Sequence, residues 1–228
     1  MDYETLNVLY RSRKTLLDIL EQRGYNTKPY SKFGPVEIAA MAASSVGAAN
    51  TSRVAGSTKA FRMDLEQTRP ATGGAPTKCR VEYSINRIKN RIPGFIEALT
   101  EEGNESAVDV DTTEVVVVLL EPIVEAFHLA SMSALASKSL RISFFQAHTI
   151  VNNPFEHVLV PKHELLPTSE HAEFMKANNI KSKANLPLIK FHEDMIARCM
   201  GLSIGDIVKI TRSSPSAGEY TSYRVCVP

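Results

Sequence analysis

The stretch Val115-Val116-Val117-Val118-Leu119-Leu120 is apolar throughout and largely β-branched. An unbroken apolar run of this kind is typical of a strand that is covered on both faces. The run is far shorter than the roughly 20 residues that a membrane-spanning helix needs. We therefore predict a central strand that is buried between two other layers.

The segments on either side of this strand predict an α/β domain. Residues 80–85 alternate like a strand, and residues 88–99 repeat apolar side chains on one helical face, which Pro93 and Gly94 would kink or split. Downstream, residues 123–135 can form another helix and residues 140–149 another strand. This order favours a mixed sheet with flanking helices, and we place the domain at residues 1–153.

The N-terminal part of this domain is predicted to begin with a helix. Its apolar face is broken only by the polar Arg13 and consists of Leu6, Leu9, Leu16, Leu17 and Leu20. Gly24 stands where a left-handed residue usually ends a helix. Residues 36–60, rich in Ala, Ser and Gly, form either a loosely packed helix or a surface insertion. Residues 68–77 are expected to form a flexible break, and residues 101–113 an acidic loop.

Residues 154–228 predict a separate small α+β module, so that the chain as a whole is α+β. Residues 158–160 are expected to form a short strand stopped by Pro161, and Thr168 or Ser169 to cap the start of a helix. Pro187 places the extended residues 186–189 at a sheet edge, because proline cannot donate a hydrogen bond to a central strand.

The last part of this module predicts a capped helix and a hairpin. Asp194 is a plausible N-cap for a short helix through Met200, which Gly201 would close. A turn at Gly205 and Asp206 leads into the strand at residues 207–210. A second turn at residues 215–218 leads into residues 220–227, which we expect to pair with that strand.

The composition excludes several classes of protein. An apolar fraction of 43% and a charged fraction of 22% are ordinary for a folded soluble protein, and a net charge of +1 is not the signature of a free-standing nucleic-acid binder. Three widely spaced cysteines, Cys79, Cys199 and Cys226, fit a reducing compartment better than a disulfide framework. The acidic start, Met1 to Glu4, lacks the apolar region of a signal peptide, so we expect an intracellular protein.

Charge is unevenly distributed along the chain. Residues 1–92 carry 15 Lys and Arg against 8 Asp and Glu, whereas residues 93–154 carry 2 against 9. Either the basic segment faces a phosphate backbone and the acidic segment a basic partner, or the two segments neutralise each other within one domain. The cations that could contact a DNA backbone, or equally form a solvated face, are Arg11, Arg13 and Lys14 on the first helix, and Arg80, Arg87, Lys89 and Arg91 further on.

No convergent set of catalytic residues is recognisable. The chain has no Gly-rich phosphate loop, nucleophile elbow or Cys-x-x-Cys pair, and its histidines and Cys199 lack the spacing of metal ligands. Asp109 and Asp111 suggest one part of a nuclease site, but no lysine follows the next strand until Lys138. We therefore predict no catalysis, no metal site and no cofactor, and a structural or partner-facing role for the histidines.

In its last residues the sequence resembles the fifth-subunit family of eukaryotic RNA polymerases, whose C-terminal module by itself forms a small archaeal RNA polymerase subunit. The similar stretches are residues 157–163 (HVLVPKH), 186–189 (LPLI), 201–212 (GLSIGDIVKITR) and 218–225 (GEYTSYRV), with residues 9–15 and 23–25 resembling the family's opening helix. These motifs supply the candidates for partner binding: His157, Val160, Pro161, Lys162, His163, Leu186, Pro187, Gly201, Gly205, Val208, Lys209, Arg212, Gly218, Tyr220, Tyr223 and Arg224.

The resemblance implies a non-catalytic subunit of a multisubunit DNA-dependent RNA polymerase. Its N-terminal domain would be a jaw near downstream duplex DNA, and its C-terminal module would dock on the largest subunit. The alternatives are a free-standing transcription regulator and a nuclease-like DNA-binding protein that use the same module.

Three departures from the family pattern are visible. Met195 follows Asp194 where the family usually has proline, Glu219 stands where a basic residue is commoner, and residues 26–140 cannot be matched one by one. A divergent jaw on a retained module suggests a polymerase encoded by a large DNA virus. The chain would then lie in the host cytoplasm and the virion, or in the nucleus if it is from a cellular eukaryote.

Overall fold

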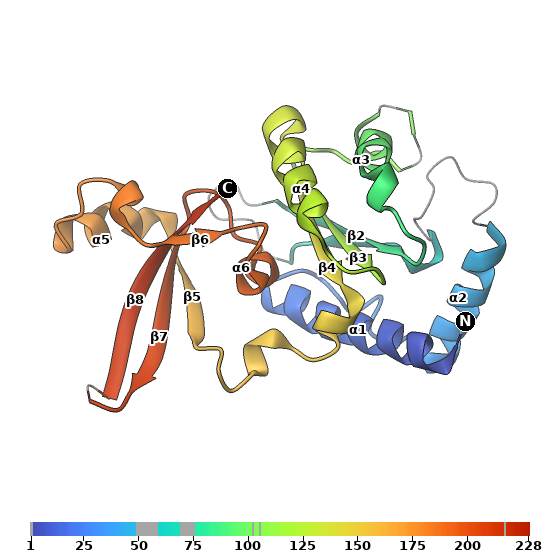
Figure 1. Cartoon of the computed structure of the whole chain (residues 1–228), viewed down its shortest axis with the longest axis horizontal. Helices are drawn as coiled ribbons and strands as arrows, with labels where there is room; N and C mark the ends of the chain where they lie inside the picture. Colours follow the sequence, from blue (N-terminus) through green and yellow to red (C-terminus); the bar gives the residue numbers. More distant parts are fainter. Residues whose placement is uncertain (1, 49–58, 69–75, 102, 105, 217) are drawn as a thin grey trace. The chain divides into compact units, whose positions relative to one another are not determined.

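The computed structural model describes residues 2–48, 59–68, 76–101, 103–104, 106–216 and 218–228. The chain folds as two compact units, Met1–Asn153 and Pro154–Pro228 (Figure 1). Residues 49–58 of the Ala-, Ser- and Gly-rich stretch and residues 69–75 of the predicted flexible break lie outside the described residues. None of the helices in the described ranges is long and apolar enough to cross a membrane.

The N-terminal unit is built on a four-stranded mixed sheet with the strand order β1-β2-β3-β4. Strand β1 is antiparallel to β2, whereas β2, β3 and β4 run parallel. Its strands are β1 (Met63–Glu66), β2 (Lys78–Ser84), β3 (Thr113–Leu119) and β4 (Arg141–Gln146). Its helices are α1 (Tyr3–Gln22), α2 (Pro35–Ala48), α3 (Ile92–Thr100) and α4 (Glu125–Lys138), with short 3-10 segments η1 (Lys59–Phe61), η2 (Lys89–Arg91) and η3 (Ala147–Ile150).

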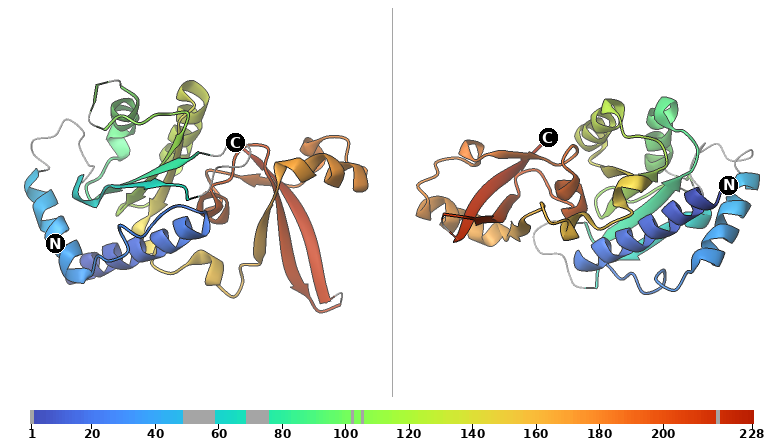
Figure 2. Two further views of the ribbon diagram at one scale, coloured as in Figure 1. Left: turned by 180° about the vertical axis from the view of Figure 1, so that it is seen from behind. Right: turned by 60° about the horizontal axis from the view of Figure 1, so that its bottom comes forward.

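Strand β3 is the predicted central strand, and every one of its residues is buried. Its side chains Val115, Val117 and Leu119 pack into one core with buried residues of α3, α4 and β4. Helix α1 lies on the opposite face of the sheet (Figure 2) and buries Leu9, Leu16 and Leu20 among other side chains. The prediction of an α/β unit with a covered central strand is therefore confirmed.

The ends of the helices follow local chemistry. Gly24 has φ +91°, and the Tyr25 N–H donates to the Leu20 carbonyl at 3.0 Å, which ends α1 as predicted. The predicted helical stretch 88–99 is divided into η2 and α3. Pro93 lies in the first turn of α3, where its missing N–H is not needed. Residues 36–48 of the Ala-rich stretch belong to helix α2, and Ile38 is buried.

The short edge strand β1 is an element that the sequence did not predict. Its four residues, Met63–Glu66, give too few alternations to stand out from their surroundings. The outer side of β1 is protected by Tyr30, whose hydroxyl donates to the Asp64 carbonyl at 3.2 Å and accepts from the Asp64 N–H at 3.1 Å. Exposed strand edges in proteins are commonly covered in such ways, because an open edge can pair with another chain.

A buried ion pair joins the basic and acidic segments of this unit. Arg23 Nη2 contacts Glu114 Oε1 at 2.5 Å, and the Tyr25 hydroxyl donates to the same oxygen at 2.9 Å. Burial alone would oppose ionisation of Glu114, but the Arg23 guanidinium outweighs it, so the pKa of this carboxyl lies below its ordinary value. Arg80 likewise donates to the carbonyls of Ser106 and Ala107 in the acidic loop. At these residues the basic segment 1–92 and the acidic segment 93–154 lie together, and the charge of Arg23 is neutralised by that of Glu114.

The C-terminal unit contains a second four-stranded sheet with the strand order β5-β7-β8-β6. Strand β7 is antiparallel to β5 and β8, and β6 is parallel to β8. The strands are β5 (Lys162–Leu166), β6 (Leu188–Lys190), β7 (Ile207–Ser214) and β8 (Gly218–Val227). The helices are α5 (His171–Ala177) and α6 (Met195–Met200), with 3-10 segments η4 (Pro154–Glu156), η5 (Thr168–Glu170) and η6 (Lys183–Asn185).

Most of the predicted features of this unit are present. Asp194 caps α6, since its Oδ1 accepts the N–H groups of Ile196 at 2.8 Å and Ala197 at 3.0 Å, and Gly201 closes the helix with φ 64°. The hydrogen-bonded cap therefore persists without the family's proline. Strands β7 and β8 form the predicted hairpin, and β6 lies at the sheet edge, as Pro187 suggested.

Two local predictions for this unit were wrong. Residues 158–160 form a turn, and the strand begins only after Pro161, because β5 pairs with β7 from Lys162 onward. Neither Thr168 nor Ser169 acts as a helix N-cap, since Pro167 precedes a 3-10 turn that runs into α5 without a side-chain cap. At the first place, strand pairing with β7 decided the backbone rather than local preference.

We predict that Glu114→Gln destabilises the N-terminal unit by about 3 kcal/mol, because it leaves the Arg23 charge without its buried partner. Urea unfolding of the full chain measures this change. The matched control is Glu66→Gln, which removes an exposed partner 4.0 Å from Lys78 and should cost less than about 1 kcal/mol. Equal effects of the two changes would contradict a stabilising role for the buried pair.

Candidate functional site

An exposed aliphatic turn precedes strand β5. Val158 is 96% exposed and Leu159 is 83% exposed. The turn is held by its own hydrogen bonds, because the Leu159 N–H donates to His157 Nδ1 at 3.2 Å and the Val160 N–H to the His157 carbonyl at 2.8 Å. Two aliphatic side chains in an ordered turn, facing water, are a feature of surfaces that bind other proteins. Both residues lie in a motif that resembles the polymerase subunit family, but the sequence pattern predicted a strand here instead of a turn.

Strand β5 carries two more of the candidates, Lys162 and His163, and the adjacent strand β7 carries Lys209. His163 Nδ1 lies 2.7 Å from the Pro161 carbonyl, so this histidine stabilises the strand start as a turn partner. The Lys162 ammonium lies 2.5 Å from Glu164, and this contact raises the pKa of the exposed Lys162. Lys209 of β7 reaches the same carboxylate at 4.0 Å. Lys162, Glu164 and Lys209 therefore form a small charged cluster in which one carboxylate lies near two ammonium groups.

The hairpin carries an aromatic and basic group of candidates. Arg212 and Tyr220 are directly opposite each other in the β7–β8 register, and both are exposed. Arg224 Nη1 donates to the Leu188 carbonyl at 2.9 Å. Tyr223 points to the other face, where its ring packs against Phe174 with 4.3 Å between centroids. Arg212, Tyr220 and Arg224 thus share a face that an acidic partner would complement.

Several candidates serve the fold instead of a surface. Leu186 is 8% exposed and belongs to the core with Ile207 and Val225, and Val208 is 0% exposed. These two residues are corrected from partner contacts to core residues, because both are buried. Gly201 holds a left-handed backbone at the end of α6, and Gly205 does so in the turn before β7. Pro187 and Gly218 are exposed.

The buried His171, which is not among the partner-binding candidates, helps to connect three segments of this unit. His171 is 5% exposed, its Nε2 lies 3.1 Å from the Leu166 carbonyl, and its Nδ1 lies 2.9 Å from Lys183 Nζ. Lys183 also donates to the Gly205 carbonyl at 2.7 Å. No sequence spacing could have paired His171 with Lys183, because the fold brings them together.

The three cations of helix α1 occupy different environments. Arg11 is exposed, and its Nη2 donates to Asn152 Oδ1 at 2.8 Å, and Lys14 is exposed as well. Arg13 is only 3% exposed, donates to the Phe61 carbonyl at 3.2 Å, and lies near the rings of Tyr30 and Phe33. Arg13 is therefore corrected from a DNA-contact candidate to a core residue, and contact through Arg11 and Lys14 remains a prediction.

The later cations also differ from one another. Arg80 Nε lies 2.6 Å from Asp64 Oδ1, and Arg80 Nη1 donates to the carbonyls of Ser106 and Ala107. Arg87, Lys89 and Arg91 are exposed in the segment that follows β2. That segment lies at the carboxyl ends of the parallel strands, the edge at which open α/β sheets usually receive ligands.

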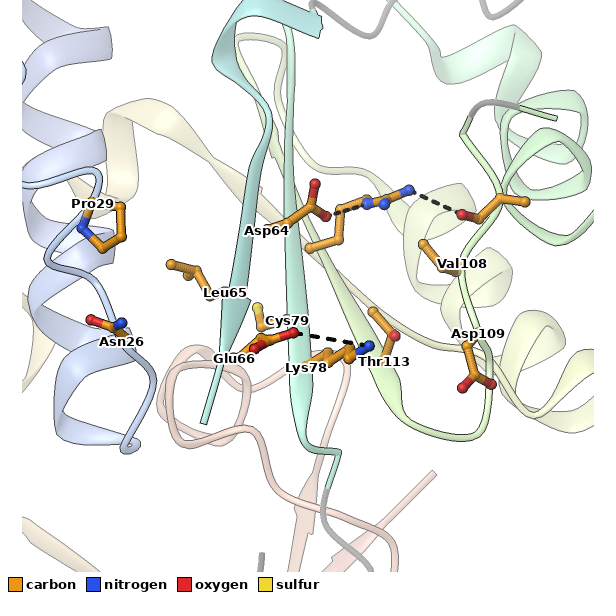
Figure 3. A pocket seen from close by; sticks show the side chains of 12 residues that line it. Asn26, Pro29, Asp64, Leu65, Glu66, Lys78, Cys79, Val108, Asp109 and Thr113 are labelled. Carbon is orange, nitrogen blue, oxygen red and sulfur yellow. Dashed lines mark hydrogen bonds and ion pairs between the residues drawn. The ribbon is translucent and has the colours of Figure 1, made fainter. Parts of the chain in front are cut away.

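A cavity of about 420 Å³ lies over strands β1 and β2 (Figure 3). Its charged side chains compensate one another across the strands, because Asp64 is in register with Arg80 and Glu66 with Lys78. Asp109 lines the cavity, but its carboxylate accepts the Asp111 N–H at 3.2 Å and the Thr112 hydroxyl at 2.7 Å. Across the described ranges, no three Asp, Glu, His or Cys side chains gather as a metal site would require.

Comparison with known proteins identifies relatives of the C-terminal unit. The sequence pattern of the family described as RNA polymerase Rpb5, C-terminal domain, matches residues 152–226. The DNA-directed RNA polymerase subunit Rpo5 of Archaeoglobus fulgidus is 50% identical over 72 residues, which cover 32% of this chain and 92% of that protein. The corresponding subunit of Methanocaldococcus jannaschii is 40% identical over 72 residues and 90% of its length.

Eukaryotic relatives match over a smaller share of their length. The DNA-directed RNA polymerases I, II, and III subunit rpabc1 of Dictyostelium discoideum is 40% identical over 90 residues, which cover 40% of this chain and 45% of that protein. The chain thus matches less than half of this longer relative. The similarity is concentrated in the unit that carries the aliphatic turn and the hairpin.

We predict that Arg13→Ala lowers the free energy of unfolding by about 2 kcal/mol, because the buried Phe61 carbonyl loses its donor and two rings lose a packed guanidinium. Lys14→Ala, one residue away on the exposed face, should change it by no more than about 0.5 kcal/mol. Chemical denaturation of both variants measures the difference. Similar values for the two would contradict the assignment of Arg13 to the core.

Proposed function

This chain belongs to the fifth-subunit (Rpb5/Rpo5) family of DNA-directed RNA polymerases, and from that premise we propose that it is a non-catalytic polymerase subunit. The C-terminal unit docks on the largest subunit, and the N-terminal unit contributes to a jaw beside downstream duplex DNA. Nucleotide addition then belongs to the complex and not to this chain.

The proposal that the C-terminal unit docks on another subunit rests mainly on the exposed turn at Val158 and Leu159. Burying an aliphatic side chain of this size contributes about 1.5–3 kcal/mol, so two of them can anchor an interface. The turn is already ordered by its own hydrogen bonds, which reduces the entropy lost on binding. Lys162 and Glu164 nearby supply a polar rim.

Contact with DNA is proposed for the exposed cations of the N-terminal unit. Arg11 and Lys14 lie on α1, and Arg87, Lys89 and Arg91 lie at the carboxyl edge of the sheet. Such side chains can contact phosphates without reading sequence, which suits a jaw that must accept any downstream duplex.

We further propose a polymerase encoded by a large DNA virus as the source. The support is the contrast between residues 152–226, which match the family pattern, and residues 26–140, in which the sequence shows no motif of the family. Isolation of the native complex from infected or uninfected cells, followed by identification of its subunits, tests the source and the compartment together.

We predict that the double change Val158→Asp and Leu159→Asp lowers co-purification of the full chain with the largest polymerase subunit by about tenfold or more. Thermal stability should be unchanged, because both side chains are exposed before binding. Pull-down from cell extract, followed by quantification of polymerase subunits, measures the effect.

The control for this change is Val36→Asp. Val36 is 79% exposed in the N-terminal unit, and the same chemical change there should leave co-purification intact. Full retention of the Val158 and Leu159 double variant would remove the aliphatic turn from the interface. A wild-type chain that migrates outside polymerase fractions in a size-separated extract would favour a free-standing regulator.

We predict that Arg11→Ala combined with Lys14→Ala weakens retention of downstream duplex by the assembled polymerase. The slope of log affinity against log salt should fall by about 0.9 for each phosphate contact that is lost. Lys176→Ala, an exposed change on α5, serves as the control and should leave the slope unchanged. An unaltered slope in the double variant would leave Arg11 and Lys14 as ordinary surface residues.

A further inference from the structure

Strand β8 has an open edge. It spans ten residues, Gly218–Val227, and on its β6 side only Val225, Cys226 and Val227 have partners, the residues Leu188–Lys190. The rest of the hairpin extends beyond β6 (Figure 1). The outer side of β8 from Gly218 to Arg224 therefore remains available to another strand.

The hydrogen bonds at the end of β8 show which backbone groups face outward. The Val225 N–H donates to the Pro187 carbonyl at 2.9 Å on the β6 side, whereas the Cys226 N–H donates to the Asp206 carbonyl at 2.8 Å on the other side. Because the direction alternates along a strand, Tyr223, Thr221 and Glu219 present their N–H and C=O groups outward. Among the described residues, no backbone group pairs with them on that side.

Pro187 explains why β6 begins only at Leu188. The residue before it, Leu186, is buried in the core with Ile207 and Val225, so the chain turns inward instead of continuing along β8. Proline itself has no N–H to extend the ladder. In the N-terminal unit, the Tyr30 hydroxyl protects the outer side of β1. The outer edge of β8 has no comparable protection among the described residues.

The side chains beside this edge indicate the chemistry of an added strand. On one face, Tyr220 is 58% exposed, with Arg212 opposite it and Arg224 further along β8. These groups favour acidic or hydroxyl side chains in the partner. On the other face, Thr221 separates Glu219 from Tyr223, so neutral or basic side chains fit there. An extended segment with acidic residues at alternate positions satisfies both faces.

We propose that an extended segment of another polymerase subunit, with acidic residues at alternate positions, adds to this sheet along the outer edge of β8 between Glu219 and Tyr223. It lies in line with β6 and receives its hydrogen bonds from the outward backbone groups. This inference rests on the proposed function for the identity of the partner, and it concerns backbone pairing at a place separate from the aliphatic turn.

The test combines one substitution with hydrogen exchange in the full chain. Thr221→Pro removes an outward N–H without removing a donor from the β7 pairing, whereas the control Thr221→Val keeps the N–H and suits a strand. Co-purification with polymerase should fall by about tenfold for the proline variant, equivalent to ~1.4 kcal/mol, and stay unchanged for the valine variant. In wild type, the amides of Glu219, Thr221 and Tyr223 should exchange rapidly in the free chain and slowly in the complex.

The outcomes separate this proposal from the broader one. If the wild-type chain assembles with polymerase but the three amides stay unprotected, strand addition is wrong while docking stands. If the chain does not assemble at all, the proposed function itself fails. If the amides become protected in the isolated chain as its concentration rises, the strand comes from a second copy, which also overturns the proposal. Should the proline variant misfold, the exchange pattern of wild type still decides.

Discussion

Strand β3 is buried along its whole length, and this burial requires every polar group beside it to find a partner inside the N-terminal unit. Glu114 meets the requirement through Arg23 and the Tyr25 hydroxyl. The ion pair connects the end of α1 to the start of the central strand, so helix and sheet are held together by charge as well as by apolar packing. Part of the uneven charge along the sequence is thus neutralised within the N-terminal unit, where Arg23 of the basic segment pairs with Glu114 of the acidic segment.

The C-terminal unit is organised differently, because so small a domain buries little core. Its strands leave two features facing water that a self-sufficient domain would normally cover: an ordered aliphatic turn and a long strand edge. The two features differ in kind, since one offers apolar area and the other offers backbone hydrogen bonds. Both features are the surfaces on which the proposed contacts with other polymerase subunits rest.

The distribution of similarity agrees with this difference between the units. Relatives match the C-terminal unit, where motif residues either build the fold, as Val208 and Leu186 do, or lie on its surface, as Arg212 and Tyr220 do. If the N-terminal unit contacts a DNA backbone as proposed, only exposed cations are required for that contact, so its sequence can vary more freely than that of the C-terminal unit.

The sequence by itself determined the central strand, the C-terminal end of α1, the cap and closure of α6, and the terminal hairpin, because each depends on neighbouring residues and their local preferences. It did not determine strand β1, the turn at Val158 and Leu159, or the burial of Arg13, which depend on contacts between distant segments. Arg13 is the clearest case: as a break in an apolar helical face it suggested exposure, yet Phe61, Tyr30 and Phe33 enclose it. Only the tertiary structure brings these residues together, since a polar side chain is stable in a core only where distant groups meet its hydrogen bonds.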